Sequence, residues 1–240
     1  VGRVVGREIA GEKCASGAYG SWGASGLTGV WAEENTREAI YNAFRRKETF
    51  ATSGPRMKVR LFAGYALSDN SLANADELSA AYATGVSMGS EIQAEGDSAP
   101  TLLAWAAQDP NSAALQRLQI IKGWENNGQS FEQVYDVACS DGGSVGPVTH
   151  RCPDNGARVD LSNCAISENL GAGELKASWT DPDFNEEHRA FYYVRALENP
   201  TCRWSTWDAL RAGTTPREDL QTTIQERVWS SPIWYVPNKG

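Results

Sequence analysis

The chain has 240 residues, of which 41% are hydrophobic and 22% are charged, so it is long enough to bury a sizeable core. Its net charge of −8 argues against a nucleic-acid-binding protein, which would present a basic face. No run approaches the roughly 18 apolar residues of a membrane span, and residues 1–8 lack the apolar centre of a signal peptide. Nine tryptophans, eight tyrosines and 23 glycines favour a β-rich fold.

Residues 26–56 contain the clearest helical pattern in the chain. Asn35 or Thr36 can cap the helix, and with Asn35 as the cap Glu38 takes the third helical position, where a capping box places a carboxylate. The apolar residues that follow fall on one face: Ala39, Ile40, Ala43 and Phe44. Residues 49–53 then have the composition of a short strand.

From Met57 onward the apolar residues alternate with polar ones, which predicts a half-buried strand. Residues 70–83 suit either a helix or an insertion loop, and residues 139–168 have the composition of a long loop. We expect further short strands, with turns between them, at residues 85–93, 101–106, 115–124, 131–138, 175–179, 189–197 and 224–236. Seven or more short strands separated by turns predict a mainly β protein, an antiparallel β-sandwich.

The five cysteines point to disulfides. No Cys-x-x-Cys pair is present, so disulfides are a better interpretation than a metal site. The four candidates allow three pairings, among which the sequence does not choose: Cys139, Cys152, Cys164 and Cys202. Disulfides imply an oxidising compartment, so we expect a periplasmic or extracellular protein. Cys14 would be a free thiol or would pair outside this chain; the alternative is that all five cysteines are reduced and buried.

The start of the expected helix is a candidate for the rim of a substrate site. The free N–H groups and the dipole of a helix N-terminus attract anions. Four residues lead into this one and are the rim candidates: Trp31, Glu33, Glu34 and Asn35. Arg56, beyond the strand, could bind a phosphate or a carboxylate with both arms of its guanidinium. The alternatives are helix capping beside a packed tryptophan, and an ion pair of Arg56 at a domain junction.

Metal ligands are scarce in the sequence. Neither His150 nor His188 lies in a His-x-His or Asp-x-His motif, so we do not expect a complete metal site within these residues. Residues 154–160 and 181–185 are rich enough in oxygen ligands for calcium. Their spacing is not that of an EF-hand, however, and Asp and Asn are also common turn formers.

Other binding motifs are few. Residues 203–207, together with Trp229 and Trp234, could form an aromatic sugar-binding platform or could pack in the core. The sequence has no Gly-x-Ser-x-Gly elbow, no P-loop and no dinucleotide-binding fingerprint.

Four long stretches resemble one large family of uncharacterised bacterial proteins that are built on a PHP-type metal-dependent hydrolase domain. They cover residues 26–56 (GLTGVWAEENTREAIYNAFRRKETFATSGPR), 174–184 (ELKASWTDPDF), 190–208 (AFYYVRALENPTCRWSTWD) and 225–237 (QERVWSSPIWYVP). The resemblance implies that residues 1–56 are the tail of a PHP-like α/β barrel, with its last helix and strand. Residues 57–240 would then form a β-sandwich accessory domain that carries the cysteine-bearing loop.

The resemblance also implies a function. The chain would be the C-terminal portion of a PHP-like metal-dependent hydrolase, a phosphoesterase whose metal ligands lie upstream of Val1. Two or three divalent transition-metal ions are expected in the full-length protein and none bound by this chain alone, which by itself would be inactive. The expected partners are the N-terminal PHP-like part of the same protein and a small-molecule substrate.

A second hypothesis belongs to another class of protein. The aromatic content, the cysteine loop and the scarcity of metal ligands also suit a non-catalytic, secreted β-sandwich that acts as a binding or assembly module. Such a module could form homo-oligomers. Neither hypothesis involves nucleic acid or a membrane span.

Overall fold

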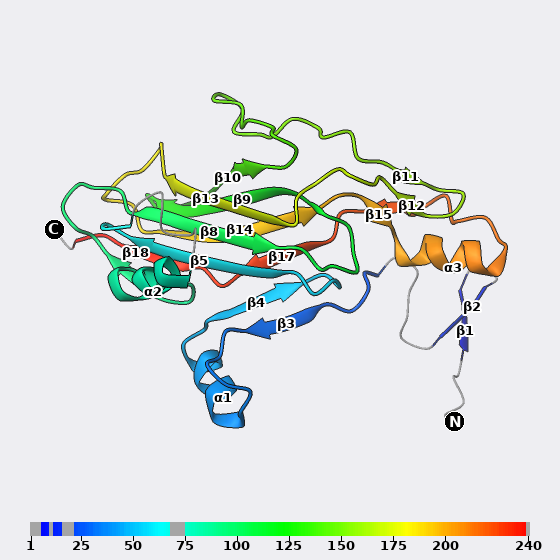
Figure 1. Ribbon diagram of the computed structural model, residues 1–240, viewed down its shortest axis with the longest axis horizontal. Helices are drawn as coiled ribbons and strands as arrows, with labels where there is room; N and C mark the ends of the chain where they lie inside the picture. The colour runs from blue at the N-terminus through cyan, green and yellow to red at the C-terminus, as the bar shows by residue number, and fades with distance from the viewer. Residues whose placement is uncertain (1–5, 10–11, 16–21, 68–74, 239–240) are drawn as a thin grey trace.

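Two β-sheets that face each other form most of the molecule (Figure 1). The computed structural model describes residues 6–9, 12–15, 22–67 and 75–238. The strands of the larger sheet are β3 (Leu27–Val30), β4 (Thr49–Thr52), β7 (Glu91–Gln93), β9 (Leu115–Asn126), β10 (Gln129–Cys139), β14 (Ala190–Glu198), β17 (Arg227–Ser230) and β18 (Ile233–Val236). They follow the order β10-β9-β14-β17-β4-β3, with β18 beside β14 and β7 beside β18.

The smaller sheet has the order β13-β8-β5-β6. Its strands are β5 (Lys58–Gly64), β6 (Val86–Ser87), β8 (Thr101–Ala107) and β13 (Glu174–Thr180). In the part of the chain that the structure describes, three two-stranded ribbons lie outside both sheets: β1 (Gly6–Ile9) with β2 (Glu12–Ala15), β11 (Val159–Asp160) with β12 (Ala165–Ile166), and β15 (Thr201–Cys202) with β16 (Thr223–Ile224). Among the described strand pairs only β18 and β7 run parallel, so the prediction of a mainly β fold with antiparallel sheets is confirmed.

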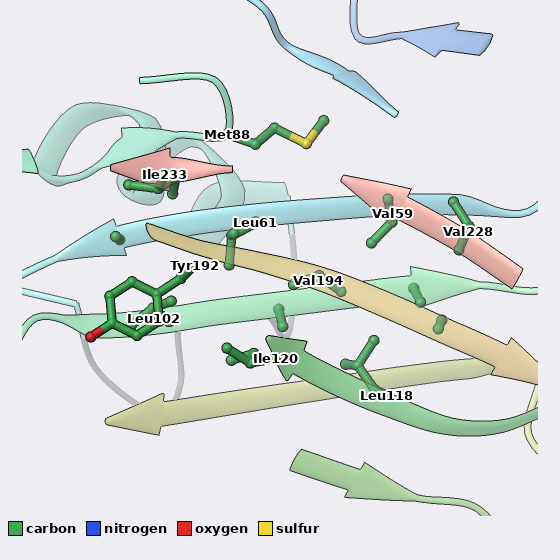
Figure 2. Close-up of a cluster of buried hydrophobic side chains, with 14 of the residues drawn as sticks. Val59, Leu61, Met88, Leu102, Leu118, Ile120, Tyr192, Val194, Val228 and Ile233 are labelled. Atoms are coloured by element: carbon green, nitrogen blue, oxygen red, sulfur yellow. The ribbon is translucent and has the colours of Figure 1, made fainter. Parts of the chain in front are cut away.

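The main core fills the space between the two sheets (Figure 2). The expected alternation from Met57 is confirmed: Val59 and Leu61 of β5 point into this core. Tyr192 and Val194 enter it from β14, whose residues alternate between buried and half-buried along the whole strand. Complete burial of a large apolar side chain stabilises the fold by about 1.5–3 kcal/mol, so this alternation fixes which face of each strand turns inward.

A smaller core lies on the outer face of the smaller sheet. Phe62 of β5 and Leu103 of β8 are buried there together with Ala81 of α2 (Ala75–Thr84). Residues 70–83 were expected to form a helix or a loop, and the structure has a helix from Ala75 onward; residues 68–74 lie outside the described part. None of the described helices is long and apolar enough to cross a membrane.

The helix expected near residue 36 is α1 (Arg37–Arg45), and it stands away from both sheets (Figure 1). Thr36, one of the two expected caps, begins it: the Thr36 hydroxyl accepts a hydrogen bond from the Ala39 N–H at 3.2 Å. Of the expected apolar face only Ala43 is buried, whereas the Phe44 side chain is 49% exposed.

The segment that the resemblance assigns to a PHP-like barrel is joined to the larger sheet. Its strand is β4, which pairs with β3 on one side and with β17 on the other. The described fold does not show a barrel remnant, and the assignment of residues 1–56 to a PHP-like domain, with a boundary before Met57, stays a prediction.

One helix, α3 (Trp204–Ala212), was not expected. It covers most of residues 203–207, which the sequence suggested for an aromatic platform. No side-chain hydrogen bond caps its start at Arg203, so the usual N-terminal signal is missing. Its end is marked by Gly213, whose positive φ of 66° suits glycine.

Candidate functional site

The loop between β3 and α1 builds the expected rim. Glu33, Glu34 and Asn35 are exposed there. A cavity of about 250 Å³ opens beside the helix start and is lined by Glu33, Glu34, Thr36, Glu38, Ala39, Asn42 and Arg46. Three carboxylates face one guanidinium in this cavity. A bare anion would therefore be repelled, whereas a cation, or an anion that is bridged by a metal ion, would be attracted.

Trp31 lies beneath the rim and packs against the smaller sheet. Its indole N–H donates to the Val59 carbonyl at 2.8 Å, and the Arg60 guanidinium lies 3.5 Å above its ring centre. Such a cation–π contact is worth about 0.5–2 kcal/mol. These contacts match the alternative of a packed tryptophan; the role of Trp31 at a substrate rim stays a prediction.

A chain of polar contacts holds the other end of α1. Arg60 donates to the Tyr82 hydroxyl at 2.6 Å, and that hydroxyl donates to Glu48. The Glu48 carboxylate is almost fully buried and pairs with Arg46 at 3.4 Å. Burial, and then the hydrogen bond to Glu48, raises the pKa of Tyr82 to about 12. The segment that directly follows α1 is thus fixed to α2 and β5.

Arg56 is held by its backbone, not by its side chain. Its N–H donates to the Asp109 carboxylate at 2.7 Å, and the side chain is exposed. This bond is the main reason that the pKa of Asp109 lies below its usual value. Arg56 is not among the residues that line the cavity at α1. Of the expected rim residues, the structure brings together Glu33 and Glu34 in this cavity, but not Arg56.

The histidines do not form a metal centre. The His150 ring packs edge-on against Tyr135, with 5.1 Å between the ring centres, and the His188 N–H donates to the Asn185 carbonyl in a turn. Among the described residues, no group of three or more His, Cys, Asp and Glu side chains could hold a metal ion.

One loop suggested for calcium holds a buried ion pair instead. Asp181 pairs with Lys122 at 2.5 Å, and the two side chains are 1% and 3% exposed. The Tyr192 hydroxyl also donates to Asp181 at 2.7 Å, while the Tyr135 hydroxyl donates to Asp183 at the same distance. Burial and the Asp181 charge raise the pKa of Tyr192 above its usual value. The positive charge beside the Asp181 carboxylate is therefore the Lys122 ammonium, which takes the place expected for calcium.

In the other suggested loop, residues 154–160, the two Asp carboxylates are exposed and bonded within turns. The Asp154 carboxylate pairs with Arg158 at 2.8 Å and accepts the Gly156 N–H at 3.0 Å. Asp160 accepts the backbone N–H of Ser162 at 2.8 Å. These bonds are typical of Asx turns, which was the alternative to calcium.

The cysteine loop is cross-linked as expected, and the structure supplies the pairing. Cys139 bonds to Cys152, and Cys164 bonds to Cys202. The first bridge ties the loop to the end of β10, and the second ties it to β15, next to α3. The side chain of Cys14 lies outside the described part of the structure.

The aromatic residues are distributed differently from the expected platform. Trp229 lies on β17 opposite Arg195, and residues 204–207 lie in α3. Trp234 instead joins a separate hollow of about 460 Å³, which we call the aromatic groove; its lining is Gly123, Trp124, Glu125, Ser130, Phe131, Glu132, Arg189, Phe191 and Trp234. The sequence did not indicate this groove, because its residues come from four strands and the segments between them.

The sequence did not indicate the buried Glu198 or its half-buried neighbour Glu226. Glu198 ends β14, and its backbone N–H donates to the Glu226 carbonyl at 3.1 Å. One carboxylate oxygen of Glu198 accepts from the Ser112 hydroxyl at 2.9 Å. The other, and one oxygen of Glu226, have no hydrogen-bond partner among the described residues. Burial, with the nearby Glu226 and Asp109 charges, raises the pKa of Glu198 to about 8.

Two facing sheets of mostly antiparallel strands and two disulfides define the chain as a mainly β, disulfide-linked protein. A family model described as "Protein of unknown function (DUF3604)" matches residues 5–237, so the chain belongs to this family. No curated protein and no solved structure matches the chain. The expected membership of an uncharacterised family is confirmed, while the PHP-type domain and the hydrolase activity stay predictions.

Proposed function

We propose that this chain is the C-terminal portion of a PHP-like metal-dependent hydrolase that acts on phosphate esters. The proposal rests on the resemblance of residues 26–56 to such proteins and on one structural observation, the acidic cavity at the start of α1. In this proposal the metal ligands lie upstream of Val1. The two or three divalent ions that they hold would lower the pKa of a bound water.

The residues of this chain would form the rim of the site. Glu33 and Glu34 give the cavity its negative charge, so they would repel a free phosphate ester and admit one that is bound to divalent cations. The Trp31 contacts hold this loop against β5. Arg56 is exposed beyond β4 and does not line the cavity. It is a candidate for binding a part of the anionic substrate that extends outside the cavity.

An uncovered surface supports the presence of a further domain. β3 is the last strand of the larger sheet, and none of the described strands pairs with its outer edge. Three apolar side chains of β3 and α1 are exposed by 44%, 59% and 49%: Leu27, Tyr41 and Phe44. Open edges and apolar patches favour association. We assign this surface, the α1 surface, to the N-terminal PHP-like part of the same protein.

The two disulfides support an oxidising compartment for the protein. We therefore propose a periplasmic or extracellular location for the protein.

The deciding experiment compares the full-length protein with this chain alone. We expect the full-length protein to contain two or three transition-metal ions by elemental analysis and to hydrolyse p-nitrophenyl phosphate or its diester, whereas the isolated chain does neither. Glu33→Gln with Glu34→Gln should lower turnover and leave the metal content unchanged; Glu218→Gln, an exposed residue outside the cavity, is the control. A full-length protein without metal and without turnover would refute the proposal.

A second candidate function is a non-catalytic, secreted binding module. The observation that favours it is the aromatic groove, which keeps Phe131 and Trp234 about 40% exposed. Oligomers of the isolated chain, or a ligand bound without any metal, would support this candidate.

A further inference from the structure

Two pairs of aromatic rings line the aromatic groove, and the strand register places them on opposite faces of the larger sheet. Trp124 and Phe131 lie at the hairpin end of β9 and β10 and stack nearly parallel, with 5.4 Å between ring centres and 17° between planes. Phe191 of β14 and Trp234 of β18 are 5.0 Å apart and tilted by 52°. Phe131 is 41% exposed and Trp234 is 39% exposed, so each pair offers ring surface to solvent.

Gly123 allows the second pair to lie close to the sheet. It is the register partner of Phe191 on the neighbouring strand. A Cβ atom at Gly123 would lie only 2.3 Å from the Phe191 ring, so the ring would have to move if any other residue stood there. The absence of a side chain therefore lets the Phe191 ring lie across β9, where Tyr193 stacks parallel to it at 6.4 Å.

Polar groups stand among the rings. Glu125 accepts the Gly128 N–H with one oxygen, so its other oxygen is available. Glu132 and Arg189 also line the groove, and neither forms an ion pair with any described residue within 4 Å. The groove thus offers carboxylate acceptors and guanidinium donors close to flat apolar surfaces.

This combination narrows the chemistry of the ligand. An anion would meet two carboxylates and one guanidinium. A purely apolar molecule would take those charged groups out of water without giving them partners. A cation would meet the Arg189 guanidinium.

We propose that the aromatic groove binds a neutral carbohydrate. The C–H face of a sugar ring can pack on Trp234, which shares a face of the sheet with Glu132, and its hydroxyls can both donate to Glu132 and accept from Arg189. A volume of about 460 Å³ lies within the usual range for small-ligand sites. The inference rests on the second candidate function, and it does not depend on whether the full-length protein is a hydrolase.

The test is a binding measurement on the whole chain in the presence of EDTA. A panel of neutral oligosaccharides, such as β-linked glucose and galactose oligomers, is titrated by calorimetry, with a sulfated oligosaccharide and choline as charged probes. We expect at least one neutral oligosaccharide to bind and the charged probes to bind more weakly. EDTA separates this outcome from the hydrolase proposal, which requires metal.

Two variants and a matched control locate the binding. Trp234→Ala should weaken it by roughly tenfold or more, and Glu132→Gln should weaken it to a lesser extent. Trp207→Ala is the control, because Trp207 is similarly exposed (37%) but lies on α3 outside the groove. The inference fails if no neutral oligosaccharide binds, if a charged probe binds best, or if Trp234→Ala behaves like Trp207→Ala while both variants remain folded.

Discussion

Glu198 links the stability of the molecule to pH. Its pKa is about 8 in the folded chain and 4.5 without the influence of the fold. Between these two values the folded state binds the proton more tightly than the unfolded state. The free energy of unfolding should therefore decrease as the pH rises from about 4.5 to about 8, and the loss should be complete above that range.

This gives the first prediction. Glu198→Gln, which resembles the protonated side chain, should remove most of the decrease between pH 5 and pH 9 and should be more stable than the parent at pH 9. Urea unfolding at a series of pH values measures the effect. Glu218→Gln, at an exposed position, should keep the parent profile. A Glu198→Gln profile that matches the parent would show that another group is responsible.

The second prediction concerns the buried pair of Lys122 and Asp181. Removing one partner of such a pair leaves a buried charge alone, which costs about 3–5 kcal/mol. Lys122→Met should therefore lower the free energy of unfolding by that amount in denaturant titrations. Lys176→Met is the control, because the Lys176 pair with Glu174 is far more exposed, and it should cost less than about 1 kcal/mol. Equal losses in the two variants would contradict this account.

At the scale of elements, α1 presents large apolar side chains to solvent. Tyr41 and Phe44 are exposed, so Tyr41→Ser and Phe44→Ser should change the stability of the isolated chain by less than about 0.5 kcal/mol. In the full-length protein the same residues should be covered. Hydrogen exchange of residues 37–45 should then be slower in the full-length protein than in the isolated chain, and Phe44→Ser should reduce the difference. Equal exchange in both would remove the assignment of the α1 surface to the PHP-like part.

Several elements could be predicted because their signal is local. The alternation in β5 and in β14 follows directly from which side chains face the core. Glu198 lies two residues after Ala196, so it falls on the buried side of the same alternation. This position in the pattern could have predicted that Glu198 is buried. The α3 helix gave no such signal, because its start has no capping side chain.

The groove and the disulfide pairing could not be predicted for a different reason. Gly123 and Phe191 are neighbours only through the register of β9 and β14, and Trp234 reaches Phe191 only because β18 pairs with the same strand. Cys164 meets Cys202 across 38 positions of sequence. Contacts of this kind depend on which strands are neighbours and in what register they pair. The hydrophobic pattern of a single strand does not reveal either.

At the scale of the whole molecule, the two disulfides limit how far the unfolded chain can expand. The bridges span 13 and 38 residues. In the chain-entropy model they contribute about 3 and about 4 kcal/mol respectively. We predict that reduction lowers the free energy of unfolding, and that Cys164→Ala with Cys202→Ala costs more than Cys139→Ala with Cys152→Ala. Denaturant titrations with and without reductant measure this, and the reverse order would show that strain or residual structure outweighs loop length.

The position of β17 and β18 has a consequence for the order of assembly. β17 pairs with both β14 and β4, and β18 pairs with both β14 and β7. Three strands from the first half of the chain, β3, β4 and β7, are thus joined to the rest of the larger sheet by β17 and β18, which come late in the sequence. During synthesis from the N-terminus, β3, β4 and β7 are made first. They can join the larger sheet only after β17 and β18 have been synthesised. A ribosome-bound chain that stops before Arg227 would contain most of the strands of both sheets. It would lack β17, so β4 would not be paired with the rest of the larger sheet.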